Sequence, residues 1–160
     1  MERVEKPIIL AVFPPGEDRT SLDNIIGHSD WQLQFTCLFE ETQTALGARP
    51  IAVVFSEGHL TDGHCWKDIL QELQVMSNPP ALIVVDRLAD DVLWAEVLNL
   101  GGHDLLTKPF NPKEVLHAVA TACHFVEGQR VRAVALRKPP ESVGRDGMGG
   151  TKERAASSGR

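Results

Sequence analysis

The stretch around Glu57 holds several side chains that could take part in ion or proton chemistry. Glu57 ends an apolar run, and Asp62 follows it closely. His59, His64 and Cys65 lie in the same stretch, and imidazole and thiolate groups are zinc ligands. Their spacing matches no standard zinc motif and brings no fourth ligand, so we expect no metal and no other cofactor here. The two carboxylates remain as candidate acceptors or ion-pair partners.

A lysine ends another apolar run, where the sequence HDLLT is followed by Lys108 and Pro109. Proline donates no hydrogen bond to a sheet, and it favours extended geometry in the residue before it. Lys108 is therefore predicted to be the last extended residue of a strand, a long cation at a strand end. Asp86 directly follows Val85 at the end of the run 81–86. Asp86 points either toward Lys108 or outward as a turn residue, and the sequence leaves both open.

Five apolar or alternating runs have the length and composition of β-strands. They cover residues 7–13, 32–37, 51–56, 81–86 and 103–107. The segments between and after these runs have apolar residues at helical spacing and are predicted to be helices. They cover residues 20–28, 39–47, 63–76, 90–102 and 111–126. Strands that alternate with helices five times predict an α/β fold, with a parallel sheet covered by helices on both faces. In such folds ligands and chemistry lie at the carboxyl ends of the strands, where Glu57 and Lys108 are expected.

Charge and composition divide the chain into two parts. Residues 1–127 have 8 basic and 19 acidic residues, a net charge of -11, and residues 128–160 have 8 basic and 3 acidic residues, a net charge of +5. The two sum to the -6 of the whole chain. We expect residues 1–127 to form one domain. Residues 128–160 are rich in Gly, Ser, Pro and Arg, and we expect a basic, disordered tail there. A weak electrostatic tether is the alternative role of this tail.

The composition also bears on partners and location. An acidic chain is not expected to bind nucleic acid. No apolar run approaches the length of a membrane span, and the first run lacks the flanks of a signal peptide. The three cysteines are too scattered to suggest a disulfide framework. These features favour a cytoplasmic protein without a membrane partner.

Residues 7 to about 126 resemble a response-regulator receiver domain, the phospho-accepting module of two-component signalling. The resemblance is carried by VVFSEGHLTDGHCWKDIL (53–70) and by GGHDLLTKPFNPKEVLHAV (101–119). It implies a flavodoxin-like, doubly wound sheet of five parallel strands in the order 2-1-3-4-5. It also implies a cis peptide bond between Lys108 and Pro109.

The same resemblance shows where the sequence departs from an active receiver. It places Glu57 at the phosphoacceptor position and Lys108 at the position that pairs with the phosphoryl group. Phe13 and Pro14 stand where an acidic pair would hold Mg²⁺, and Val85 stands where a Thr or Ser would bind the phosphoryl group. Phe13 and Pro14 offer no side-chain oxygen to a hard cation. The resemblance is therefore to a degenerate receiver, or pseudo-receiver, with no catalytic residue and no enzyme activity.

The predicted function is protein–protein interaction without Mg²⁺-dependent phosphorylation. The resemblance suggests a histidine kinase, phosphotransfer protein or output protein as partner, and it also admits a homodimer. The predicted surface comprises the helix over 90–102, the strand over 103–107 and the helix over 111–126. One alternative is a small-molecule binder that uses the cleft at the strand ends.

The other alternative is a phosphorylated switch with an unorthodox acceptor. Its acceptor would be Asp62, Glu57 or Asp86, with Glu17 or Asp18 as further carboxylates. Outside that alternative, Glu17 and Asp18 are interpreted as first-turn carboxylates that the helix dipole favours. For Lys108 itself we predict a direct or water-bridged ion pair with Glu57, with Asp86 as a second candidate anion.

Overall fold

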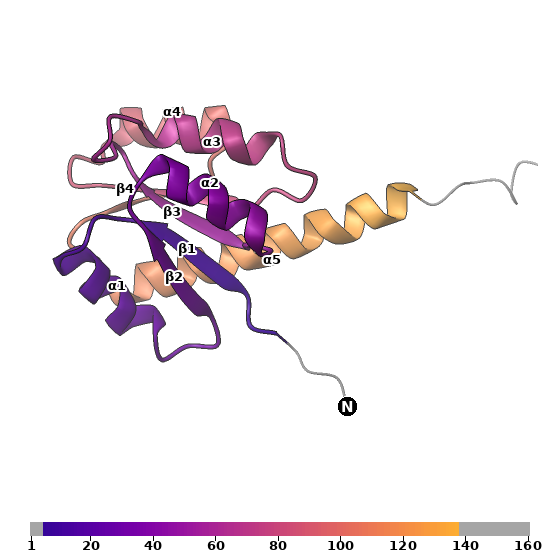
Figure 1. The fold of residues 1–160 in the computed structure, drawn as a ribbon, viewed down its shortest axis with the longest axis horizontal. Helices are drawn as coiled ribbons and strands as arrows, with labels where there is room; N and C mark the ends of the chain where they lie inside the picture. The colour runs from indigo at the N-terminus through magenta and orange to yellow at the C-terminus, as the bar shows by residue number, and fades with distance from the viewer. Residues whose placement is uncertain (1–4, 138–160) are drawn as a thin grey trace, which may run out of the picture. The chain divides into compact units, whose positions relative to one another are not determined.

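The structure is a computed structural model that describes residues 5–137. The chain divides after Gly128 into two compact units, and the sheet, core and site described below lie in the first. Strands and helices alternate along this unit (Figure 1). The strands are β1 (Ile8–Val12), β2 (Gln32–Thr36), β3 (Val53–Glu57), β4 (Ala81–Asp86) and β5 (Asp104–Thr107). The helices are α1 (Glu17–Ile26), α2 (Phe39–Ala48), α3 (Trp66–Gln74), α4 (Asp91–Leu100) and α5 (Pro112–Arg137).

All five strands are parallel and lie in the order β2-β1-β3-β4-β5. This order confirms the predicted flavodoxin-like topology. Pairing of β3 with β4 continues to the last residues, where Glu57 lies opposite Val85. Asp86 lies opposite Thr107 at the corresponding end of β5, one residue before Lys108. The carboxyl ends of β3, β4 and β5 therefore meet at one edge of the sheet.

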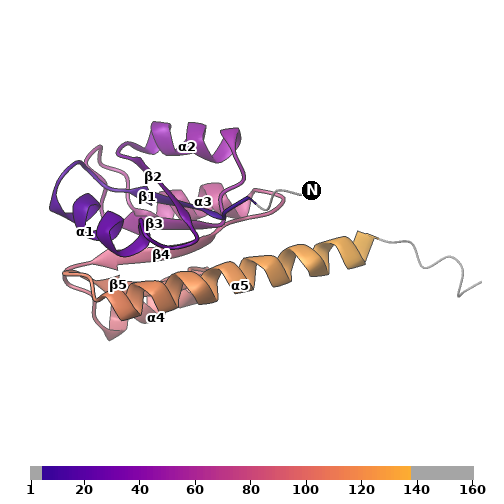
Figure 2. The ribbon, with the colours of Figure 1, turned by 90° about the horizontal axis from the view of Figure 1, so that it is seen from below.

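Each face of the sheet has its own apolar core. On one face, side chains of β1, β3 and β4 pack against α1 and the part of α5 that begins the helix, with Leu22 and Val119 fully buried. On the other face, the alternate side chains pack against α2, α3 and α4, with Ile69 and Val97 fully buried. Figure 2 shows α2 and α5 on opposite sides of the sheet. The central strands are buried on both faces, as their continuous aliphatic sequences predicted.

Several helix ends follow from local sequence signals. Asn111 accepts hydrogen bonds from the backbone N–H groups of Lys113 and Glu114 at the start of α5, as an N-cap residue does. Gly101 ends α4 in the left-handed conformation at φ 112°, which a residue with a Cβ rarely adopts. The predicted stop at Gly47 was wrong, because α2 continues to Ala48.

Two boundaries differ from the sequence analysis in ways that matter below. Helix α1 begins at Glu17, three residues earlier than its apolar spacing indicated. Helix α5 continues through residues 128–137, which the sequence analysis had assigned to the tail. The predicted disorder of residues 138–160 lies outside the described residues. None of the helices in the described part of the chain is long and apolar enough to cross a membrane.

Candidate functional site

Lys108 is held between two carboxylates at the carboxyl edge of the sheet. Its Nζ donates a hydrogen bond to Asp18 Oδ2 at 2.8 Å and another to Glu57 Oε2. Only 7% of the Lys108 side chain is exposed, against 25% for Asp18 and 16% for Glu57. The predicted ion pair between Lys108 and Glu57 is therefore present, and the contact is direct. The Lys108–Pro109 peptide is cis, as the resemblance implied.

Desolvation acts to lower the pKa of Lys108, because burial penalises the charged amine. The hydrogen bonds and charges of Asp18 and Glu57 outweigh that effect together and raise the pKa above its ordinary value. Lys108 therefore carries its positive charge throughout the physiological pH range. One cation faces two carboxylates, which accept hydrogen bonds from two of its three N–H groups.

Phe13 fills the space beneath the lysine. The Phe13 side chain is fully buried, and the Lys108 Nζ lies 5.8 Å from the centre of its ring. The ring of Phe110 stacks on it with centroids 6.1 Å apart. The Phe13 carbonyl accepts a hydrogen bond from Arg19 Nε at 2.9 Å. A buried apolar ring and its neighbours thus lie beside the lysine cluster.

Asp18 has a role in the site that the sequence did not predict. It lies in the first turn of α1, as predicted, and it also accepts the 2.8 Å hydrogen bond from Lys108. The early start of α1 at Glu17 brings this carboxylate to the sheet edge. A signal was available in the sequence, because Asp18 follows β1 by only a few residues and parallel strands end at the same edge.

Asp86 does not pair with Lys108. Its Oδ1 accepts a hydrogen bond from the backbone N–H of Leu88 at 2.8 Å, which makes it a turn residue after β4. Its Oδ2 lies so close to Gly58 that a Cβ at that glycine would collide with it. Of the two orientations that the sequence leaves open for Asp86, the structure therefore has the turn residue. Val85 is fully buried beside it and offers no hydroxyl.

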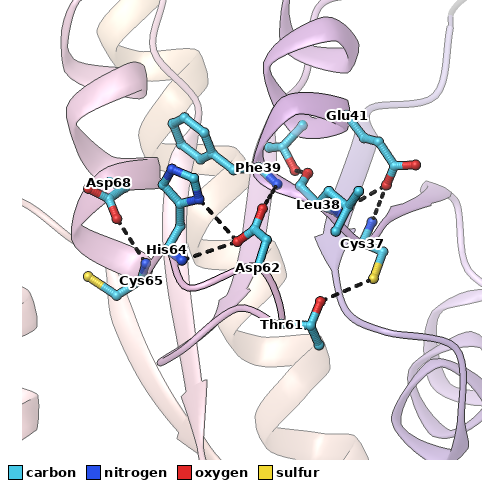
Figure 3. A network of polar contacts seen from close by, with 10 residues as sticks. Cys37, Leu38, Phe39, Glu41, Thr61, Asp62, His64, Cys65 and Asp68 are labelled. Carbon is cyan, nitrogen blue, oxygen red and sulfur yellow. Dashed lines mark hydrogen bonds and ion pairs between the residues drawn. The ribbon is translucent and has the colours of Figure 1, made fainter.

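The loop after β3 is held against the start of α2 (Figure 3). Asp62 Oδ2 accepts a hydrogen bond from the backbone N–H of Phe39 at 2.8 Å, and Asp62 Oδ1 accepts one from the backbone N–H of His64 at 3.1 Å. The His64 ring stacks on Phe39 with centroids 4.3 Å apart. The bond from Phe39 is the main cause that lowers the pKa of Asp62, against a smaller opposing effect of desolvation. Asp62 thus binds the start of α2 through the backbone of Phe39, and it makes no hydrogen bond to Lys108.

The histidines and cysteine of this loop do not converge on a metal site. Within residues 5–137, no three His, Cys, Asp or Glu side chains are placed to hold a metal ion together. His59 and Cys65 instead form a short antiparallel bridge across the base of the loop. Cys65 is also the N-cap residue of α3, where Asp68 accepts a hydrogen bond from its backbone N–H at 2.9 Å.

An open hollow of about 440 Å³ lies beside the lysine cluster. Its walls come from the start of α1 and from the segments after β4 and β5. They are formed by Glu17, Asp18, Thr20, Ser21, Arg87, Pro109 and Phe110.

Comparisons with known proteins identify the fold. No protein-family model matches the sequence, and no curated protein matches it. Solved structures do match. The signal receiver domain of an HD domain-containing protein from Pseudomonas fluorescens Pf-5 is 22% identical with a TM-score of 0.72, over 82% of this chain and 97% of that one.

Two further solved structures agree with this one. A two-component response regulator from Clostridium difficile is 22% identical with a TM-score of 0.62, over 74% of this chain and 95% of that one. A response regulator receiver domain protein (CheY-like) from Methanospirillum hungatei JF-1 is 16% identical with a TM-score of 0.63, over 79% of this chain and 99% of that one. The chain described here therefore has the fold of the receiver domains of response regulators.

Proposed function

We propose that this protein is a receiver-like signalling module that acts through protein–protein contact and does not undergo Mg²⁺-dependent aspartyl phosphorylation. Glu57 is the equivalent of the phosphoacceptor and Lys108 the equivalent of the phosphate-pairing lysine. Phe13 and Pro14 replace the acidic pair, and Val85 replaces the hydroxyl residue. The module has no enzyme activity of its own, and it works in the cytoplasm with a kinase, phosphotransfer or output protein.

The bonds that Lys108 makes are the single observation that carries this proposal. In a phosphorylated receiver the lysine pairs with a phosphoryl group, whose charge the protein must hold in place. Here the carboxylates of Asp18 and Glu57 already occupy the lysine. The buried ring of Phe13 lies beside them in place of a metal ligand. The proposal is therefore that one conformation is held permanently by side chains of the chain itself.

Titration with Mg²⁺ is expected to leave the site unchanged. A hard cation needs several oxygen ligands, and one oxygen of Glu57 and one of Asp18 are already bonded to the ammonium group of Lys108. The measurement is the amide NMR spectrum of the full chain while MgCl₂ is added, with NaCl at equal ionic strength as the control. Saturable shifts at Glu57, Gly58 and Lys108 at low millimolar Mg²⁺ would sink the proposal and favour the unorthodox phospho-switch.

The proposed contact surface is the face formed by α4, β5 and α5. Trp94 and Leu98 of α4 are 48% and 36% exposed, and Leu116 of α5 is 37% exposed. Large apolar side chains that stay in water on one face are typical of a contact surface. Leu88 and Val92, just before and within α4, are more exposed still, at 83% and 78%. Helix α4 buries only Val97 completely, so most of its apolar content faces outward.

Replacing Trp94 with alanine is expected to change the free energy of unfolding by less than about 1 kcal/mol, because half of the side chain is in water. The matched control is Trp66→Ala, which removes a 4% exposed indole and is expected to cost about 3–5 kcal/mol. Urea unfolding followed by circular dichroism measures both. A loss for Trp94→Ala as large as that for Trp66→Ala would mean that Trp94 belongs to the core and not to a contact surface.

The small-molecule alternative has one observation in its favour, the open hollow beside Asp18 and Pro109. A ligand that is retained through purification and that shifts the amide signals of Thr20, Ser21 and Phe110 would support it. The lining of the hollow is mainly polar or charged, with Glu17, Asp18 and Arg87 among its residues, and it offers a ligand few apolar contacts. The interaction module therefore remains the function that the geometry supports best.

A further inference from the structure

The outer side of α4 combines apolar and acidic side chains in one stripe. Asp91, Trp94, Ala95 and Leu98 follow each other at the spacing i, i+3, i+4, i+7, which places them on one line along the helix. All four are exposed. The α4 stripe, as we call these four residues, begins at its N-terminal end with Asp91 and continues with two large apolar groups.

Acidic charge dominates the surroundings of the α4 stripe. Between Leu88 and Thr107 the sequence has four acidic residues and no lysine or arginine. Among the described residues, Glu96 is the only one of these four in an ion pair, with Lys67 of α3 at 2.9 Å. Asp90 accepts a hydrogen bond from the backbone N–H of Leu93 as the N-cap of α4 and lies at the start of the stripe. The field at this end of α4 is therefore negative.

A second copy of the chain is a poor match for this stripe. Between Leu88 and Glu127, which covers α4, β5 and the part of α5 that lies in the first unit, the chain has six acidic residues and two lysines. One of the two is Lys108, which is almost fully buried and bonded to Asp18 and Glu57. Within this stretch, Lys113 alone remains to meet the acids of a partner copy. Facing like charges across a contact costs free energy, so this composition opposes a symmetric dimer.

We infer that the α4 stripe is a docking site for a basic amphipathic helix of a partner protein, an inference that rests on the proposed function. The apolar side of such a helix covers Trp94 and Leu98, and its lysines or arginines lie near Asp90 and Asp91. Apolar anchors supply most of the affinity at such sites, and the complementary charges select the partner and speed the encounter.

The test uses the full chain labelled with ¹⁵N and a synthetic helical peptide built of leucine and lysine. A peptide of equal length built of leucine and glutamate is its control. The expected result is a saturable shift of the amide signals of α4 with the lysine peptide, weakened by added NaCl, and no saturable shift with the glutamate peptide. Trp94→Ala is expected to weaken binding of the lysine peptide about tenfold.

Two charge-reversal variants distinguish binding at the α4 stripe from general attraction of a basic peptide to an acidic protein. Asp91→Lys is expected to weaken binding of the lysine peptide roughly fivefold, because it places a like charge at the start of the stripe. Asp23 is an exposed residue of α1, away from the stripe. Asp23→Lys makes the same change in net charge and is expected to leave the affinity for the lysine peptide unchanged. Equal weakening by both variants would overturn the inference, since binding would then follow net charge alone.

Two results that identify a different occupant of the α4 stripe would also overturn the inference. Shifts of the α4 signals on dilution of the free chain, with no effect of the peptide, would identify a second copy as the occupant. Shifts of the α4 signals together with those of residues 138–160 when salt is added, again with no peptide effect, would identify the chain's own basic segment. Either result leaves the proposed function standing, because that function is tested separately by Mg²⁺ at Glu57 and Lys108.

Discussion

Replacing Lys108 with methionine is expected to lower the free energy of unfolding by about 2 kcal/mol. The change leaves the carboxylates of Asp18 and Glu57 facing each other, although only 25% and 16% of these side chains are exposed. Stranding a partner of a buried ion pair costs about 3–5 kcal/mol, and an exposed pair is worth about 0–1 kcal/mol. Because the cluster is partly open to water, we expect a value between these limits. Urea unfolding at pH 7 measures the loss.

The matched control for this variant is Lys67→Met. Lys67 also forms an ion pair, with Glu96 at 2.9 Å, but both side chains are nearly half exposed. Its loss is expected to cost less than about 0.5 kcal/mol. Adding Glu57→Gln to Lys108→Met should recover part of the lost stability, since one stranded charge is removed. If Lys108→Met were as mild as Lys67→Met, the lysine cluster would not be the closed unit that its geometry indicates.

Replacing Phe13 with alanine is expected to lower the free energy of unfolding by about 3–4 kcal/mol. The ring is fully buried and packs against Phe110, so its removal leaves a cavity beneath Lys108. Phe13→Leu keeps most of the volume and is expected to cost about 1 kcal/mol. Thermal and urea unfolding of both variants measure this difference.

Phe125→Ala is the control that separates burial from loss of an aromatic ring. Phe125 is 50% exposed and touches the His103 ring, and its replacement is expected to cost less than about 1 kcal/mol. A Phe13→Ala variant that is no less stable than Phe125→Ala would show that the space beneath Lys108 is not a packed core. The proposal that Phe13 replaces a metal ligand would then lose its physical basis.

The sheet could be predicted from the sequence because its signals are local and repeated. Continuous aliphatic runs such as ALIVVD indicated strands buried on both faces, and the structure buries β4 completely up to Val85. The pair of Lys108 and Glu57 could also be predicted, since Glu57 ends β3 and Lys108 directly follows β5 at the same edge of the sheet. The strand order itself came from the resemblance to receiver domains.

The rest of the site depends on boundaries that apolar periodicity does not fix. Asp18 was missed because its helix begins with polar residues, so the first turn of α1 carries no apolar signal. Asp86 was left open between two orientations, and a turn hydrogen bond to Leu88 decided it. The extension of α5 past Gly128 was missed because glycine and arginine there resembled the composition of a tail. Short-range hydrogen bonds of this kind are set by the three-dimensional arrangement and leave weak traces in sequence.

The central claim is that this receiver fold does not take a phosphoryl group at Glu57. The most direct measurement is intact-mass spectrometry of the full chain after incubation with a small acyl phosphate and Mg²⁺, with an active receiver domain as the positive control. We expect the positive control to gain a phosphoryl adduct and this chain to gain none, because Asp18 and Glu57 already hold Lys108 and Phe13 supplies no metal ligand. A Mg²⁺-dependent adduct that maps to Glu57, Asp62 or Asp86 would contradict the account.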